Sequence, residues 1–151
     1  MEENLWKNLN IDPLGKCIDD IMLTIQIFSK CRTILCLNPH SWVEAEKDNK
    51  FRDALVNADW LLADGVGVSI ASGFFKSPSS PRMPGPDLYL KLMHRLNEQG
   101  GKVFFLGSTK ETLSKIKDKI ETDFKNLKIA GIYSPPFEAQ FTDQENKKMI
   151  E

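Results

Sequence analysis

The sequence predicts an α/β fold with a mainly parallel, Rossmann-like sheet and helices on both of its faces. Three observations support this prediction. Short apolar runs alternate with longer segments of helical periodicity, the runs contain β-branched residues, and Gly or Pro separates the two kinds of segment. Crossovers in such sheets are right-handed, and ligands bind beyond the carboxyl ends of the strands. We expect one domain over residues 1–151, a common domain length.

Before the first strand, the apolar residues recur at three- and four-residue spacing, as on one face of a helix: Ile18, Ile21, Met22, Ile25 and Phe28. Residues 33–37 then form a short apolar run that predicts a buried strand. Ser41-x-x-Glu44 has the spacing of a capping box and predicts that Ser41 opens a helix. Phe51, Ala54, Leu55 and Ala58 continue the apolar face of that helix.

Residues 60–63 predict a second strand, which Asp64-Gly65 ends. The apolar segment 66–72 predicts a buried helix closed by Gly73. Residues 76–86 contain four prolines and three serines and predict a loop. A helix over 86–99 is expected next, with Leu88, Leu92 and Leu96 on its apolar face and two glycines after it.

Residues 102–106 predict a third strand and residues 127–133 a fourth. Between them, Ser108-x-x-Glu111 predicts a second capping box, followed by a helix with Leu113, Ile116, Ile120 and Phe124 on one face. Thr142-x-x-Glu145 predicts a third capping box. The sequence ends about two turns later, and from this we expect it to be the front part of a longer protein.

The composition excludes several classes of function. There are 20 basic and 21 acidic residues, so the chain lacks the clustered positive charge that nucleic-acid binding requires. The sequence contains no apolar run of the roughly 20 residues needed to span a bilayer. Its start lacks the pattern of a secretory signal, and we expect a cytoplasmic location. The three cysteines and two histidines predict neither a disulfide framework nor a metal site.

Asp64 is the strongest candidate for chemistry because it directly follows an apolar strand. A carboxylate there can act as a general base, and Gly65 and Gly67 allow another molecule to approach the backbone. Two alternatives remain open. Asp64 can simply cap the following helix, and the two glycines can begin a dinucleotide-binding fingerprint, although Ile70 occupies its third glycine position.

Further candidates also come with ordinary structural alternatives. Arg82 suits a phosphate group, but a solvated surface arginine is more common. Asp87 suits the first turn of a helix or a ligand hydroxyl, and Asn38 suits a sugar or a turn before Pro39. Gly107 suits either a phosphate-facing turn or a plain strand-to-helix turn. Asn38, Asp64 and Gly107 each follow a strand, so we expect them at one edge of the sheet.

Together these segments resemble the WecG/TagA/CpsF family of bacterial glycosyltransferases. The stretches that carry the resemblance are LNPHSWVEAEKDNKFRDAL, ADWLLADGVGV, PRMPGPDL, KVFFLGSTKETL and IAGIYSPPF, in the order and spacing of the family. The resemblance covers roughly residues 34–151 and, more faintly, LNIDPLGKCIDD before them. The block ADxxxxDGxG followed by R-x-x-G-x-D-L is the specific part.

The resemblance implies an inverting transferase that takes a sugar, often N-acetylmannosamine, from a UDP-sugar. The implied acceptor is a sugar on a polyprenyl diphosphate at the inner membrane face, in the synthesis of teichoic acid, common antigen or exopolysaccharide. By position, Asp64 falls on the catalytic base and Arg82 on an active-site arginine. The implied substrate-binding residues are Cys36, Asn38, Gly65, Gly67, Gly85, Asp87, Gly107 and Ser108. No metal or other cofactor is expected, and a homo-oligomer is compatible with the resemblance.

Three departures from the family pattern stand out. The family usually has Thr at the positions of Cys36 and Pro84. Family chains also continue with further α/β units, a later active-site glutamine and a C-terminal appendage that contacts the membrane. Two other functions are therefore kept open: a dinucleotide-binding oxidoreductase domain, predicted by the Gly65-x-Gly67 turn, and a non-catalytic fragment or partner, predicted by the missing later segments.

Overall fold

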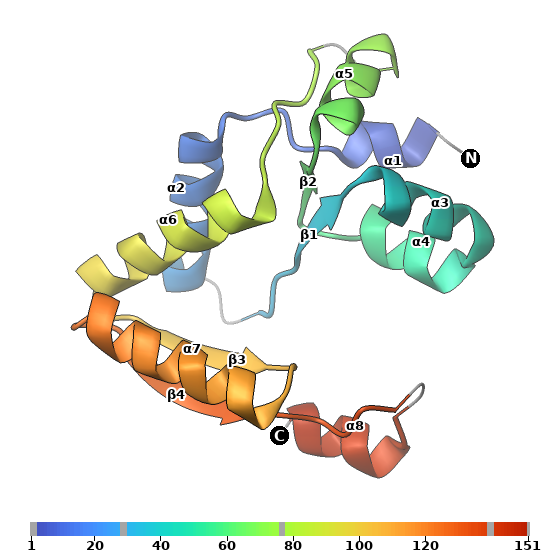
Figure 1. The fold of residues 1–151 in the computed structure, drawn as a ribbon. Coiled ribbons are helices and arrows are strands. Elements are labelled where there is room, and N and C mark those ends of the chain that lie inside the picture. The colour runs from blue at the N-terminus through green and yellow to red at the C-terminus, as the bar shows by residue number, and fades with distance from the viewer. Residues whose placement is uncertain (1–2, 28–29, 76–77, 139–140, 151) are drawn as a thin grey trace. The chain divides into compact units, whose positions relative to one another are not determined.

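The computed structural model describes residues 3–27, 30–75, 78–138 and 141–150. The chain divides into two compact units, Met1–Leu92 and Met93–Glu151. Each unit contains one pair of parallel strands with helices packed around it (Figure 1). The predicted mixed α/β class with parallel strands is therefore confirmed.

In the first unit, β1 (Ile34–Leu37) pairs in parallel with β2 (Trp60–Ala63), with Ile34 opposite Trp60 and Leu37 opposite Ala63. The other edge of β2 carries two isolated parallel bridges, Leu9 to Leu61 and Ala63 to Arg82. The helices of this unit are α1 (Glu3–Asn8), α2 (Leu14–Ile27), α3 (Pro39–Lys47), α4 (Asn49–Val56), α5 (Val66–Phe75) and the start of α6 (Gly85–Glu98).

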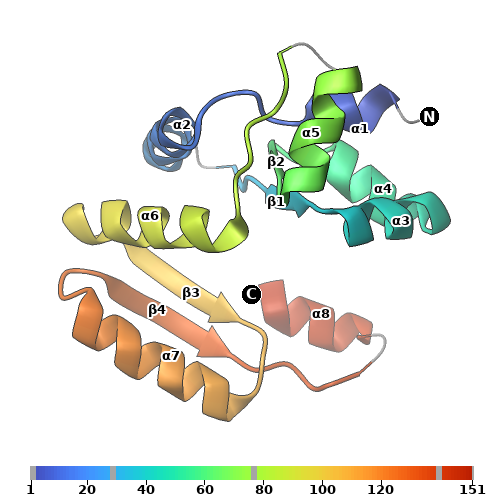
Figure 2. The same ribbon diagram turned by 45° about the horizontal axis from the view of Figure 1, so that its top comes forward.

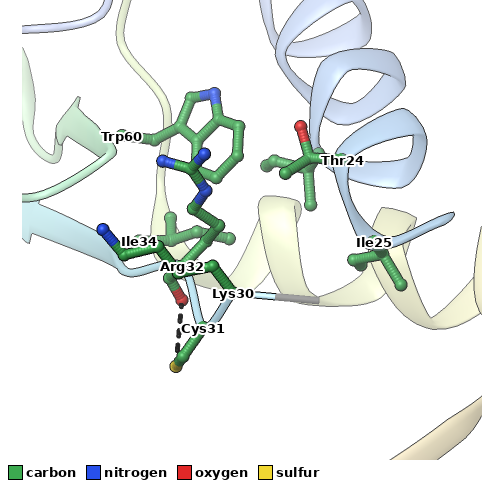
Figure 3. Close-up of a pocket in the computed structure, with 8 residues that line it drawn as sticks. Thr24, Ile25, Lys30, Cys31, Arg32, Ile34 and Trp60 are labelled. Atoms are coloured by element: carbon green, nitrogen blue, oxygen red, sulfur yellow. Dashed lines mark hydrogen bonds between the residues drawn. The ribbon is translucent and has the colours of Figure 1, made fainter. Parts of the chain in front are cut away.

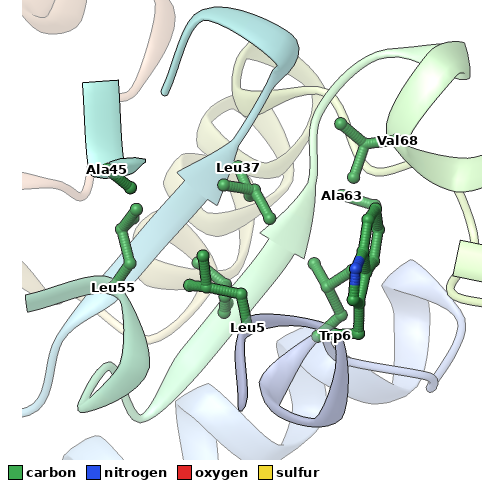
Figure 4. Close-up of a cluster of buried hydrophobic side chains, with 9 residues drawn as sticks. Leu5, Trp6, Leu37, Ala45, Leu55, Ala63 and Val68 are labelled. Atoms are coloured by element: carbon green, nitrogen blue, oxygen red, sulfur yellow. The ribbon is translucent and has the colours of Figure 1, made fainter. Parts of the chain in front are cut away.

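One core of this unit lies between the strand pair and α1, α3, α4 and α5. Figure 4 shows Leu37 and Ala63 from the two strands converging with Leu5, Leu55 and Val68 from three helices. Trp6 joins this cluster, and its ring stacks on Trp42 at 4.5 Å and on Phe75 at 5.0 Å between centroids. Successive residues of a strand point to opposite faces, so Leu62, which is fully buried, lies on the other face of the pair.

Helix α2 lies on the opposite side of β1 and β2 from α3 and α4 (Figures 1 and 2). Its buried residues are Cys17, Ile18, Ile21 and Met22, which matches the predicted apolar face. Ile25, predicted on the same face, is exposed. Phe28 lies outside the described residues.

The predicted helix opening at Ser41 was wrong in two respects. Asn38 is the N-cap of α3: its Oδ1 accepts hydrogen bonds from Ser41 N at 2.8 Å and from Ser41 Oγ at 3.0 Å. Pro39 follows at the first helical position, where a missing N–H costs nothing. The helix also breaks after Lys47, because Asp48 turns into the extended region and caps α4 through its carboxylate.

The prediction that residues 66–72 form a buried helix was also wrong in part. Helix α5 continues through Gly73 to Phe75, and its outer face is apolar. Val66, Ile70 and Phe74 are 63%, 60% and 82% exposed, while Val68 and Ser72 are buried. Four-residue spacing puts the three exposed side chains on one face of the helix. Because both faces of the segment are apolar, its composition did not predict which face is buried.

The second unit contains β3 (Lys102–Leu106), α7 (Lys110–Asp123), β4 (Lys128–Tyr133) and α8 (Asp143–Ile150). β3 and β4 are parallel, with an irregularity between Val103 and Phe104 that brings Phe104 opposite Gly131. A Cβ built on Gly131 would come within 2.6 Å of the Phe104 ring, so the ring lies directly over this glycine. Helix α7 covers one face of the pair (Figure 2).

That covered face holds the core of the second unit. Met93, Ile120, Phe124 and Leu127 are buried there, against Val103, Phe105 and Ile129 from the strands. Phe104 and Leu106, which alternate with Val103 and Phe105 along β3, are exposed on the other face. The second unit therefore presents one packed and one open apolar face of its strand pair.

The two capping boxes predicted in this unit had different outcomes. Thr109, not Ser108, is the N-cap of α7, with its Oγ1 accepting from Thr112 N at 3.2 Å. The Thr142–Glu145 box is confirmed: Thr142 N donates to Glu145 Oε2 at 2.7 Å, and Glu145 N donates to Thr142 Oγ1 at 3.3 Å. In the described part of the chain, no helix is long and apolar enough to cross a membrane.

Candidate active site

The carboxyl ends of β1 and β2 place Asn38 and Asp64 at one edge of the strand pair. Leu37 and Ala63, the last residues of the two strands, are partners, and Asp64 N donates to Leu37 O at 2.9 Å. Helices α3 and α5 both begin at this edge. Two strand ends and two helix N-termini therefore meet there, which is the usual position of a ligand site in a parallel sheet.

Asp64 is half-buried and lies between a fully buried strand residue and Gly65. Gly65 has φ +99°, a left-handed conformation that glycine adopts without strain. Within the described residues, the Asp64 carboxylate makes no hydrogen bond to the first amides of α5. The capping alternative thus finds no support in the described residues.

Asn38 has a structural role in this geometry, because its side-chain oxygen caps α3. The same hydrogen bonds fix the amide group at the strand edge, one residue after Leu37. Sequence reasoning treated Asn38 as a ligand or turn residue and missed the cap. The pair Asn38-Pro39 was the available signal, since Asn is favoured at the N-cap and Pro directly after it.

Cys36 lies beside Asp64 and the start of α6. Burial raises the pKa of its thiol, and the negative charge of Asp64 raises it further. A Cβ added to Gly85 would meet Cys36 Sγ at 3.6 Å, so the first residue of α6 packs against the thiol. Cys36 is accordingly a neutral, half-buried group at neutral pH, near the candidate base.

Arg82 reaches the same edge from the loop between α5 and α6. Its backbone forms an isolated parallel bridge with Ala63, the residue before Asp64. Met83 is fully buried, and its N–H donates to Ala63 O at 2.8 Å. The Arg82 side chain is exposed. The loop that was predicted from its prolines therefore continues the edge of β2 and sets the backbone of Arg82 beside Ala63, the residue before Asp64.

The remaining predicted residues divide between the two units. Gly67 is in the first turn of α5, and Asp87 is exposed in the first turn of α6, where a carboxylate favours the helix dipole. Gly107 and Ser108 follow β3 in the second unit. Both have positive φ, at +117° and +64°, and Gly107 N donates to Tyr133 O at 3.0 Å. They form a tight strand-to-helix turn, and Ser108 is strained in it.

Two features near Asp64 escaped sequence reasoning. An apolar cavity of about 410 Å³ lies between α1, α3 and α5, lined by Trp6, Pro39, Trp42, Val43, Gly67, Val68 and Ala71. The loop before Arg82 is also tied to α5 by serine hydrogen bonds. No short motif marks either feature, because each depends on contacts between segments distant in sequence.

A second hollow of about 410 Å³ lies at the other end of the strands, where Ile34 and Trp60 begin β1 and β2. Figure 3 shows Arg32 beside the Trp60 indole, with Thr24 and Ile25 of α2 across the hollow. Arg32 is paired with Asp59. This hollow is therefore separate from the edge that holds Asp64.

Over residues 3–27, 30–75, 78–138 and 141–150, no group of three or more His, Cys, Asp or Glu side chains could hold a metal ion. The expectation that the reaction needs no metal or cofactor stays a prediction.

Comparison with known proteins decides the family. The model of the glycosyl transferase WecG/TagA/CpsF family matches residues 7–151. This chain belongs to the WecG/TagA/CpsF family. The resemblance inferred from the ADWLLADGVGV and PRMPGPDL blocks is thus confirmed, and the family match extends into α1, before the stretches that carried it.

Two curated relatives are both named N-acetylglucosaminyldiphosphoundecaprenol N-acetyl-beta-D-mannosaminyltransferase. The protein of Bacillus spizizenii is 31% identical over 98 residues, which cover 65% of this chain and 38% of the relative. The protein of Bacillus subtilis strain 168 is 30% identical over 98 residues, with the same shares. The matched part of this family member spans about 38% of the length of these relatives.

Proposed function

We propose that this chain supplies the base-bearing part of an inverting glycosyltransferase that takes a sugar from a UDP-sugar and transfers it to a polyprenyl-diphosphate-linked acceptor. The observation that carries the proposal is the bridge between Ala63 and Arg82. It sets the backbone of Arg82 beside Ala63, the residue before Asp64, at the carboxyl edge of the strand pair. A base and a cation at one edge suit a reaction in which a hydroxyl loses a proton while a diphosphate leaves.

In the proposed reaction, the acceptor hydroxyl oxygen attacks the anomeric carbon of the donor sugar. The bond from that carbon to the UDP oxygen breaks, and UDP departs with the electron pair. Asp64 takes the hydroxyl proton, and the configuration at the anomeric carbon inverts in this single displacement. Arg82 and the N-terminal amides of α5 stabilise the charge that builds on the diphosphate. The scheme requires no metal.

The acceptor part of the proposal comes from the relatives, whose names specify a diphosphoundecaprenol-linked sugar and an N-acetylmannosaminyl group. A lipid-linked acceptor implies work at the inner face of the plasma membrane, as a peripheral protein. It also implies contact with the membrane. Products of this type would enter teichoic acid or other cell-surface polysaccharides.

The proposal is tested by ligand titration of the complete protein that carries this sequence. UDP is expected to bind more tightly than AMP or NADH, without added magnesium, in isothermal calorimetry. Arg82→Ala should weaken UDP binding while leaving thermal unfolding in the absence of UDP nearly unchanged, because the side chain is exposed. Loss of a charge-assisted hydrogen bond is worth roughly 1.5–3 kcal/mol.

The oxidoreductase alternative makes the opposite prediction for the same titration. Gly65 and Gly67 stand where a dinucleotide fingerprint begins, but the side chain of Ile70 at the third position is exposed. Equal or tighter binding of NADH would favour that alternative over the transferase. If neither nucleotide binds, the result favours the hypothesis of a non-catalytic fragment or partner.

A further inference from the structure

Three serines join α5 to the loop that carries Arg82. Ser69 Oγ donates to Ser80 O at 2.7 Å, and Ser80 N donates to Ser72 Oγ at 2.9 Å. Ser72 Oγ in turn donates to Ser69 O at 2.7 Å. Both backbone groups of Ser80 are therefore held by side chains from one helix, three residues apart.

Because this hydrogen-bond network is buried, it favours one conformation of the loop over others. Ser72 and Ser80 have no exposed surface. A buried N–H without a partner is unfavourable, so the loop prefers the conformation in which Ser80 N donates to Ser72 Oγ. Ser72 acts as acceptor and donor at once, which leaves its hydroxyl little freedom to turn elsewhere.

Arg82 lies between two fixed points. Ser80, two residues before it, is held by α5, and Met83, one residue after it, is held by the hydrogen bond to Ala63 O and by full burial. The backbone of Arg82 is thus set at a single register beside the end of β2. That backbone position determines where the Arg82 side chain leaves the chain relative to Asp64.

We propose that Ser72, with Ser69, is a positioning residue that holds the loop segment of Arg82 against the end of β2. The consequence for ligand binding rests on the proposed function, in which Arg82 contacts the UDP diphosphate. The serines touch no substrate, and they act through Arg82.

The functional test is a double-mutant cycle in the complete protein. Ser72→Ala is expected to weaken UDP binding about three- to tenfold, since it removes one hydrogen bond that orders the loop. In an Arg82→Ala background the same change should have little further effect, because the serine then has no arginine to position.

Ser69→Ala, which leaves no buried donor unpaired, is the second variant in case Ser72→Ala fails to fold. Ser79→Ala, an exposed serine of the same loop, is the control.

Amide hydrogen exchange tests the positioning without any ligand. Ser72→Ala and Ser69→Ala should speed exchange at Met83 N–H, which bonds Ala63 O, and leave Asn10 N–H protected. Asn10 N–H bonds Leu61 O at 2.7 Å on the same edge of β2 and reports general loosening. Faster exchange at both amides, or at neither, would overturn the proposal, as would equal losses of UDP affinity with and without Arg82. If the unmodified protein binds no UDP, the proposed function fails, and the exchange result alone decides the positioning.

Discussion

At the scale of single residues, the surroundings of the Asp64 carboxylate are set by its neighbours. A fully buried alanine precedes it, a glycine with φ +99° follows it, and a half-buried thiol lies beside it. Within the described residues, the Asp64 carboxylate makes no cap with α5, while the Asp64 N–H bonds Leu37 O at 2.9 Å. A general base needs a carboxylate in a defined position, because proton transfer depends on a well-defined geometry.

Asp64→Asn separates the role of a base from a structural role. Asn keeps the size of the side chain but cannot accept the proton at neutral pH. In the complete protein we expect affinity for the UDP-sugar to persist and turnover to fall by about 10²–10⁴-fold. UDP release with a lipid-linked acceptor analogue is the measurement. Turnover close to that of the unmodified protein would remove Asp64 from the mechanism.

Cys36 reports on the charge of Asp64. Burial and that charge both raise the pKa of the thiol, and only the thiolate reacts with alkylating reagents. With the exposed Cys31 replaced by Ser, the rate of iodoacetamide labelling at Cys36 should rise with pH later than for an unperturbed thiol. Asp64→Asn should shift this rise to lower pH, because one of the two causes is removed. An unchanged profile would place the charge of Asp64 too far from Cys36 to matter.

At the scale of elements, the strands were the most predictable part. Residues 60–63 and 102–106 were predicted with the bounds that β2 and β3 have, because short apolar runs between glycine or polar residues have few alternatives. Of the edge expected to hold Asn38, Asp64 and Gly107, the part with Asn38 and Asp64 is confirmed, whereas Gly107 follows β3 in the other strand pair. The register of Arg82 beside Ala63 was not predictable, since a bridge between a loop and a strand leaves no periodic signal.

Helix starts were less predictable because several residues in a row can cap. Asn38 and Ser41 both suit an N-cap, as do Ser108 and Thr109, and the Ser-x-x-Glu spacing favoured the wrong member each time. The difference is set by where the preceding strand ends and by the backbone angles of the turn. Ser108 has φ +64°, so it cannot adopt the extended conformation of an N-cap.

The register of this turn predicts opposite effects for two neighbouring substitutions. Thr109→Ala should lower the free energy of unfolding by about 1 kcal/mol, because it removes the cap of α7. Ser108→Gly should raise it by up to about 1 kcal/mol, because glycine relieves the left-handed strain. Urea denaturation followed by circular dichroism measures both. If Ser108 were the cap, its replacement by glycine would bring no gain in stability.

At the scale of the whole molecule, each unit combines a packed core with an open apolar face. The first unit exposes Val66, Ile70 and Phe74 on α5, and the second exposes Phe104 and Leu106 on its strand pair. Parallel strands are normally covered on both faces, and large apolar patches are uncommon on stable monomers. The apolar face of α5 begins with Val66, two residues after Asp64, so it starts at the strand edge that holds Asp64.

These surfaces predict that the isolated 151-residue chain associates. Association removes apolar area from water, at roughly 25 cal/mol per Å², and sedimentation velocity should show a sedimentation coefficient that rises with concentration. Ile70→Ser with Phe74→Ser should shift the distribution toward monomer without unfolding the chain, because both side chains are exposed and contribute little to the core. Ser79→Ala, on the neighbouring loop, should leave the distribution unchanged. A single monomeric species across the concentration range would contradict this prediction. The exposed apolar residues would then be too dispersed to form an association interface.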